Sequence, residues 1–245
     1  MITRALAESV LACAMSGGAD FAEIYGQITR NNSITMMNGK IERASDNLVS
    51  GVGIRAFLGT KTVFASTSDL SPEGLFKCAR SVAAAMGEIR GDVSVNLTER
   101  IFPNIHPVKI LPSSVEAKVR ADILRQGCFA AKEADPAIVQ AMGSIAGVDH
   151  TILVANTEGL YTTDRHVRTR MAVSAVASNG SENQVGSESP GASMGFELFD
   201  QRVNPDEIGR SAATIATTML HAPFCPAGVM PVVIDNGFGG VIFHE

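Results

Sequence analysis

The sequence predicts an α+β fold in which a unit of helix, antiparallel strands and helix occurs twice. Turn signals separate runs of alternating residues in both halves, at Asn38-Gly39 and at Asn156-Thr157-Glu158-Gly159. Ser71-Pro72 and Asn204-Pro205 each place a capping residue before a proline, which begins a helix after the strands of its half. Because the same order of elements repeats, we interpret the chain as a duplicated architecture whose strand order stays open.

The prolines mark the boundaries of these units. Residues 90–112 contain three prolines and form a connector. We therefore expect one unit at about 1–90 and a second at 113–222, together an N-terminal α/β domain of residues 1–222. Prolines also crowd residues 223–245, which we expect to be a linker and the start of a further domain.

The first unit begins with an amphipathic helix. Apolar residues recur at helical spacing between Leu6 and Ala14, and the helix is expected to end at Gly17-Gly18. The helix that begins at Pro72 is expected to end near Gly87. The strands expected between the two helices are Phe21–Arg30, Ile34–Met37, Lys40–Ala44, Val49–Phe57 and Lys61–Thr67.

The second unit begins with a longer helix. Ser113 and Glu116 form a capping-box pattern, so a helix is expected from Ser113 to about Ala134. Residues 181–193 are polar and rich in Gly, which indicates either a mobile loop or a substrate-side flap. The last helix should end at about His221. The strands expected in this unit are Ala137–Gly147, His150–Ala155 and Asp164–Ser178.

The charge balance argues against a nucleic-acid binder. The net charge is −5, whereas binding to phosphates depends on clustered Lys and Arg. The basic residues of Arg165–Arg170 fall on alternate positions, so they share one strand face, which we interpret as a solvated face rather than a ligand site. Glu8 interrupts the apolar N-terminal run, and no other run is long enough to cross a bilayer. We expect a soluble, cytoplasmic protein.

The four cysteines lie far apart and form no CxxC motif, as is typical of reduced thiols in a cytosolic protein. Among them, Cys225 is the one nearest the end of the chain, where the sequence carries its clearest chemical signal.

That signal is an apolar run ending in His244-Glu245. On a helix His244 can reach a metal ion while Glu245, about 100° further round, polarises the attacking water. The alternative for a bare dipeptide is an exposed helix end with two ordinary polar residues. We interpret the chain as a fragment cut after the first ligand, because a natural end would leave Val241-Ile242-Phe243 on an unfinished turn. Val232-Val233-Ile234 is expected to be a short buried strand, followed by a turn at Asn236-Gly237.

Several segments carry a resemblance to a known family. Pro226–Val233 and Gly239–Glu245 closely resemble the stretch that enters the active site of TldD-type metalloproteases, of the TldD/PmbA family. Gly51–Phe57 with Phe64–Thr67 is similar to the first-unit hairpin of that family. Asn156–Gly159 and the long strand after it resemble the second unit. The resemblance therefore covers nearly the whole chain.

The resemblance implies a zinc-dependent metallopeptidase that cleaves flexible peptides or unstructured protein segments. His244 would be the first zinc ligand and Glu245 the general base, in a motif that continues in the family as His-Glu-x-x-x-His with a cysteine further on. The second histidine and the cysteine have no counterpart here, so the chain alone is expected to be inactive and to hold zinc only weakly. The other histidines match no family ligand and are expected on the surface or in loops: His106, His150, His166 and His221.

The family resemblance also implies a partner. Catalytic members resemble one another in forming a heterodimer with a non-catalytic paralogue of the PmbA or TldE type. One alternative is therefore that this chain is itself such a scaffold subunit, although His244-Glu245 favours the catalytic type. A second alternative, a regulator of DNA topology, is disfavoured by the acidic balance. Substrate-binding residues are not assigned, and addition of an extended peptide to a strand edge is a hypothesis without a named residue.

Overall fold

The structure, a computed structural model, describes residues 2–87, 91, 93–234 and 239–244. Its elements follow the predicted order, and the α+β class is confirmed. The first unit contains α1 (Arg4–Met15), β1 (Phe21–Met37), β2 (Lys40–Leu58), β3 (Lys61–Thr67) and α2 (Pro72–Met86). The connector holds β4 (Thr98–Glu99) and a 3-10 turn at Pro112–Ser114. The second unit and the tail contain α3 (Ala117–Glu133), β5 (Ile138–Asn156), β6 (Leu160–Ser178), β7 (Asn183–Glu188), β8 (Gly191–Ala192), α4 (Leu198–Gln201), α5 (Pro205–His221) and α6 (Gly239–Ile242).

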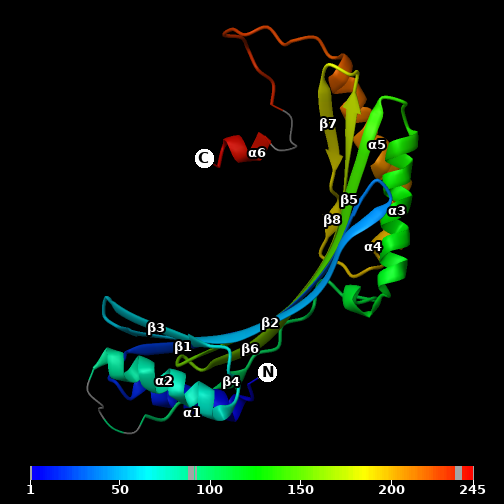
Figure 1. The fold of residues 1–245 in the computed structure, drawn as a ribbon. Helices are drawn as coiled ribbons and strands as arrows, with labels where there is room; N and C mark the ends of the chain where they lie inside the picture. The colour runs from blue at the N-terminus through cyan, green and yellow to red at the C-terminus, as the bar shows by residue number, and fades with distance from the viewer. Residues whose placement is uncertain (1, 88–90, 92, 235–238, 245) are drawn as a thin grey trace.

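The strands of both units form one sheet. Its order is β3-β2-β1-β5-β6-β4, and β7 and β8 also pair with β6. The two units are joined by β1 and β5, which pair antiparallel from Glu23 opposite Asn156 to Met37 opposite Met142. Figure 1 shows this sheet as a deep curve, with α1 and α2 covering the outer side at one end and α3 and α5 covering it at the other. The helix α6 lies across the open, inner side of the curve.

Strand alternation divides the sheet into two faces. In β1 the even-numbered residues Ala22, Ile24, Ile34 and Met36 are buried. The odd-numbered residues of β1 and their cross-strand neighbours form the opposite face, which we call the concave face. The helices pack on the even-numbered side.

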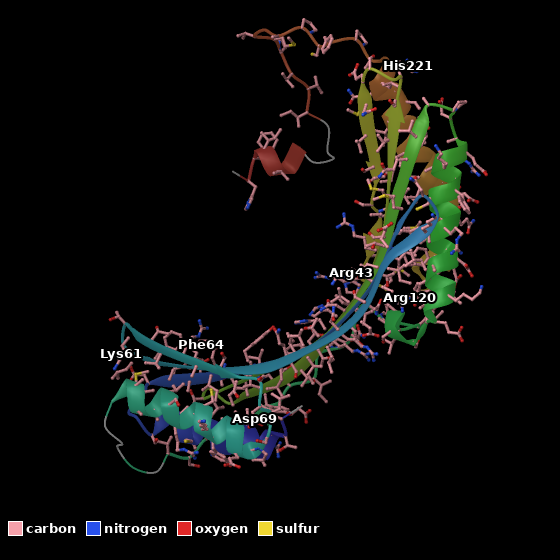
Figure 2. The ribbon with its side chains drawn as sticks, viewed as in Figure 1. Arg43, Lys61, Phe64, Asp69, Arg120 and His221 are labelled. Atoms are coloured by element: carbon pink, nitrogen blue, oxygen red, sulfur yellow. The ribbon has the colours of Figure 1, made fainter. Side chains whose placement is uncertain are left out.

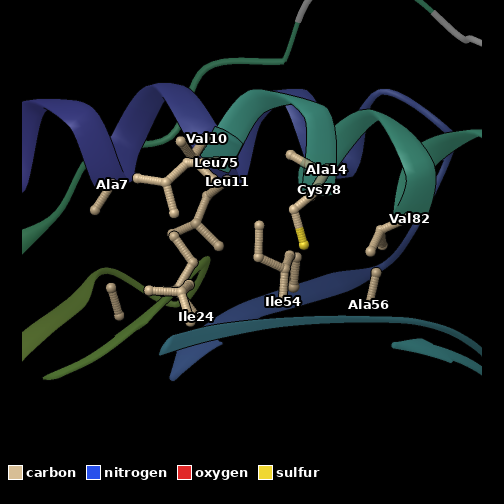
Figure 3. Packing of buried hydrophobic residues seen from close by; sticks show 14 of the residues in the cluster. Ala7, Val10, Leu11, Ala14, Ile24, Ile54, Ala56, Leu75, Cys78 and Val82 are labelled. Atoms are coloured by element: carbon tan, nitrogen blue, oxygen red, sulfur yellow. The ribbon is translucent and has the colours of Figure 1, made fainter. Parts of the chain in front are cut away.

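Each end of the sheet has its own core, and each core includes side chains from both units, because β5 and β6 reach the first core and β1 reaches the second. In the first, Leu11 of α1 and Leu75 of α2 pack with Ile24 and Ile54 of the sheet, and all four are fully buried (Figure 3). In the second core, Leu124 of α3 is fully buried among side chains from β5, β6 and α5. Burying a side chain of this size contributes roughly 1.5–3 kcal/mol, so each helix pair is held to the sheet mainly by apolar contact.

Two local features fix the second unit. Gly209 of α5 lies so close to α3 that a Cβ atom there would be 2.1 Å from the carbonyl oxygen of Gly127. The buried carboxylate of Glu197 ties the connector to the second unit, because Oε1 accepts the N–H groups of Lys109 and Gly195, each at 3.1 Å, and Oε2 accepts that of Ile110 at 2.9 Å.

Most helix and turn predictions are confirmed. Asn38 and Gly39 adopt φ values of 48° and 77°, as a type I′ turn requires. Ser71 and Asn204 cap α2 and α5 through their side chains. The predicted breaks within the long strands are wrong, because β1, β2 and β5 each run without interruption. The polar residues Asn31–Ser33 lie in the part of β1 between the two cores, where the buried Asn32 accepts a hydrogen bond from the buried Arg120 at 3.1 Å.

Three other predictions are wrong. Ser113 does not cap α3: it lies in the separate turn at Pro112–Ser114, and Glu116 precedes the helix without a side-chain cap. Residues 181–193 are neither a mobile loop nor a flap, because they contain β7 and β8, which pair with β6. Gly186 is required there because a Cβ atom would lie 2.1 Å from the Ala212 oxygen of α5. The predicted strand Val232–Ile234 is irregular and exposed, because it pairs with no described strand. The predicted turn at Asn236-Gly237 lies outside the described residues.

Candidate functional site

The concave face carries a polar hollow over its central strands. The hollow has a volume of about 340 Å³ and is lined by Tyr25, Val148, His150, Ile152, His166 and Arg168. These residues come from β1, β5 and β6, which are adjacent in the sheet, and strand alternation turns all of them to the same side. The site is therefore built from the rigid part of the fold.

Hydrogen bonds and contacts orient the imidazoles of this hollow. His150 and His166 are directly opposite each other in β5 and β6. The Nδ1 atom of His150 is hydrogen-bonded to the hydroxyl of Thr29 at 2.7 Å, and Nε2 of His166 lies 2.9 Å from a carboxylate oxygen of Asp164. Arg168, two residues further along β6 on the same face, is exposed and forms no ion pair within the described residues.

A second, less polar hollow of about 420 Å³ adjoins the first. Tyr25 lines both hollows, and Gly51 and Gly53 form part of the floor of the second. The ring of Phe64, which is 63% exposed, lies on Gly53. Figure 2 shows Phe64 and Arg43 on the inner side of the curve and Arg120 beside α3 on the outer side. A hollow that contains Arg168 and a less polar hollow thus share Tyr25 as a wall on the concave face.

The predicted metal-binding residue His244 lies apart from this face. It follows α6 and is exposed, and its backbone N–H donates to the carbonyl oxygen of Val241 at 3.1 Å. Glu245 lies outside the described residues. In the part of the chain that the structure describes, no His, Cys, Asp and Glu side chains form a group of three or more able to hold a metal ion. These residues alone do not fit a zinc centre, which needs at least three protein ligands.

Within the described stretches of the chain, the cysteines and His244 do not come together in a metal-binding cluster. Burial raises the pKa of the Cys128 thiol to about 11. Burial also raises the pKa of Cys78, which lies in the first core. Cys225 is exposed in the segment after α5.

The other histidines are mostly where the sequence suggested. His106, His166 and His221 are exposed, and His150 is half-buried in β5. Sequence reasoning gave His166 and Arg168 a shared, solvated strand face, and both are indeed exposed. It did not place His150 beside them, because the pairing of β5 with β6 that brings them together is not encoded in local spacing.

Comparison with known proteins identifies the family. The model of the PmbA/TldA metallopeptidase domain 1 matches residues 22–85, and that of the PmbA/TldA metallopeptidase central domain matches residues 110–220. The chain belongs to the PmbA/TldD metallopeptidase family. Its relatives include a metalloprotease TldD homolog of Haemophilus influenzae, 27% identical over 92% of this chain, and a metalloprotease of Methanothermobacter thermautotrophicus, 28% identical over 92%.

The chain spans about half the length of these PmbA/TldD relatives, 48% of the first and 49% of the second. Solved structures share its fold. A proposed modulator of DNA gyrase from Thermotoga maritima matches 91% of this chain and 50% of its own with a TM-score of 0.72 at 20% identity. TldE from Thermococcus kodakarensis matches 86% of this chain and 47% of its own with a TM-score of 0.62 at 17% identity.

The comparisons thus support a metallopeptidase family and its α+β fold. Among the described helices, none combines the length and the apolar character needed to cross a membrane.

Proposed function

We propose that this chain is the N-terminal part of a zinc-dependent metallopeptidase that cleaves flexible peptides or unstructured protein segments. The observation that carries the proposal is the match of two successive PmbA/TldA metallopeptidase domains, followed by the His244-Glu245 pair. Relatives named metalloproteases align over 92% of the chain. In this proposal residues 1–222 form the N-terminal domain, and residues 223–245 lead into the catalytic domain.

The proposed roles follow from side-chain chemistry. His244 would be the first zinc ligand, and Glu245 would be the general base that takes a proton from water. Zinc, when bound, supplies a Lewis acid, and its remaining ligands would come from outside the described residues. The chain alone should therefore be inactive. The concave face would contact the substrate, because its hollows lie on the side of the sheet that α6 faces (Figure 1).

The partner and the location are also part of the proposal. We propose a heterodimer with a PmbA/TldE-type paralogue, supported by the shared fold of TldE from Thermococcus kodakarensis. We propose a cytoplasmic location, supported by separated cysteines without a CxxC motif. The alternative function, a non-catalytic scaffold subunit that binds peptide and partner, is supported by the same fold similarity.

Zinc content and cleavage of an unstructured peptide test the proposal. A chain extended through the following codons of the gene to the length of the relatives should bind about one zinc ion per chain and cleave a flexible peptide in the presence of its partner. The 245-residue chain should show neither property.

In the extended chain, His244→Ala should remove zinc, whereas Glu245→Gln should remove cleavage and leave zinc bound. The exposed His106→Ala should change neither. Zinc held tightly by the 245-residue chain would contradict the assignment of the missing ligands. An extended chain without a histidine three or four residues after Glu245 would instead establish the scaffold alternative.

A further inference from the structure

The zinc chemistry proposed above gives no role to Arg168, at the centre of the concave face. Arg168 lines the hollow of about 340 Å³ and also a neighbouring one of about 480 Å³. Its neighbours on the same strand face are already engaged, since Arg170 donates to the hydroxyl of Ser189 at 2.6 Å and His166 contacts Asp164. An exposed guanidinium with no acceptor among the described residues, at the junction of two hollows, is the feature that needs an explanation.

From this arrangement we propose that Arg168, in the hollow that it shares with His150 and His166, forms a subsite that binds a carboxylate group of a bound peptide. The proposal rests on the proposed peptidase function, which supplies the peptide, and it adds a substrate class: peptides with an acidic side chain or a free C-terminus at this position.

The charges on the concave face favour an anion at Arg168. Next to it along the face of β6 are His166 and Arg170, and directly opposite it in β5 is Val148. The carboxylate nearest along the strand, Asp164, is on the far side of His166 and contacts it. Further off on this face, Glu23 is held in an ion pair with Arg55. Glu42 lines a separate hollow with Thr35 that does not include Arg168. The local field at Arg168 is therefore positive, although the whole chain is acidic.

The chemistry and size of the hollow favour a carboxylate. A guanidinium presents parallel N–H donors that match the two oxygens of a carboxylate. Val148 and Ile152 add apolar surface to the same hollow. A volume of about 340 Å³ is at the small end of the range for ligand sites, so it suits one side chain or a chain end rather than a large ligand. The net charge of −5 disfavours a nucleic-acid backbone as the occupant.

Fluorescence anisotropy with three labelled hexapeptides tests the proposal on the 245-residue chain. One peptide has a single glutamate and an amidated C-terminus, its neutral twin has glutamine instead, and the third is the glutamine peptide with a free C-terminal carboxylate. At least one carboxylate peptide should bind roughly two- to fivefold more tightly than the neutral twin, as expected for an ion pair with an exposed arginine. The peptide that gains affinity identifies the source of the carboxylate.

Matched variants assign the effect to this site. Arg168→Gln should reduce the affinity for the carboxylate peptide to that of the neutral twin, and Arg168→Lys should reduce it partly because the paired donors are lost. Arg210→Gln removes an exposed arginine from α5, on the outer side of the sheet, and should change nothing. Circular dichroism of each variant verifies the fold, and Arg168→Lys keeps the test valid should Arg168→Gln not fold.

The outcomes separate this subsite from the peptidase proposal. Equal binding of all three peptides, an equal loss in Arg210→Gln, or preferential binding of an oligonucleotide would each overturn the subsite. The binding assay needs neither zinc nor cleavage, so failure of the peptidase test leaves the binding result standing. Conversely, an extended chain that cleaves peptides without any preference at Arg168 would retain the peptidase function and reject the subsite.

Discussion

Replacement of Glu197 by glutamine should destabilise the chain by about 3 kcal/mol. The Oε1 atom accepts two backbone N–H groups and Oε2 accepts a third, that of Ile110. A glutamine that keeps its oxygen at the Oε1 position turns its NH₂ group toward the Ile110 N–H, so that a buried donor loses its acceptor at a cost of roughly 1–3 kcal/mol. The other two bonds lose their charge assistance, at roughly 0.5–1 kcal/mol each.

Urea unfolding at pH 7 measures this effect, with Glu158→Gln as a control because Glu158 is exposed. The control should stay within about 0.5 kcal/mol of the unchanged chain. If the Glu197→Gln variant is as stable as the control, the three backbone N–H groups do not require a carboxylate acceptor, and the prediction is wrong.

The pH dependence of the same variant is a second test. Burial raises the pKa of Glu197, but the N–H groups of Lys109, Glu197 itself, Ile110 and Gly195 together outweigh burial and hold that pKa below its ordinary value of 4.5. A lowered pKa contributes stability that is fully present above pH 4.5 and is lost as the pH falls through the folded-state value. The stability gap between Glu197→Gln and the unchanged chain should therefore narrow below pH 4.5, and a gap that stays constant would contradict this assignment.

Three further predictions concern packing and thiol reactivity. Gly209→Ala should cost about 1–3 kcal/mol in urea unfolding, because its Cβ would press on the Gly127 carbonyl, and a stability unchanged from that of the parent would show that α5 can move away. Leu124→Ala should cost about 2–5 kcal/mol as a cavity in the second core, measured in the same assay, and a loss below 1 kcal/mol would show that the core refills. In the folded chain iodoacetamide should modify the exposed Cys225 well before Cys128, because burial raises the pKa of Cys128 to about 11. Equal modification rates of the two thiols, measured by mass spectrometry, would contradict the burial of Cys128.

Local chemistry made much of the fold predictable from the sequence. Asn38-Gly39 specifies its turn because few other residues accept positive φ there, and Ser71 specifies its helix start because its hydroxyl binds a backbone N–H. The prediction failed where a partner distant in sequence decides the structure. Gly186 signals a loop locally, yet it is in a strand because α5 needs a surface without a side chain.

The concave face was predictable only in part, for the same reason. The spacing of His166 and Arg168 predicts their shared face, which the structure confirms. It does not predict that His150 lies opposite His166, since that contact depends on the register of β5 against β6. The assignment of His244 and Glu245 to a metal site depended on family resemblance and stays a prediction, because Glu245 lies outside the described residues.

The pairing of β1 with β5 has a consequence for how the chain is made. Roughly 120 residues separate Met37, at the end of β1, from Asn156, at the end of β5. At a synthesis rate of about 5–20 residues per second, β5 is therefore completed about 6–24 s after β1, and one edge of β1 is unpaired during that time. During that interval the first core still lacks Leu153 and Ala155 of β5, and the backbone N–H and C=O groups along this edge of β1 have no partner within the chain. A β5 strand of another nascent copy can pair with the same edge, so crowded ribosomes on one message provide a route to exchange of strands between copies.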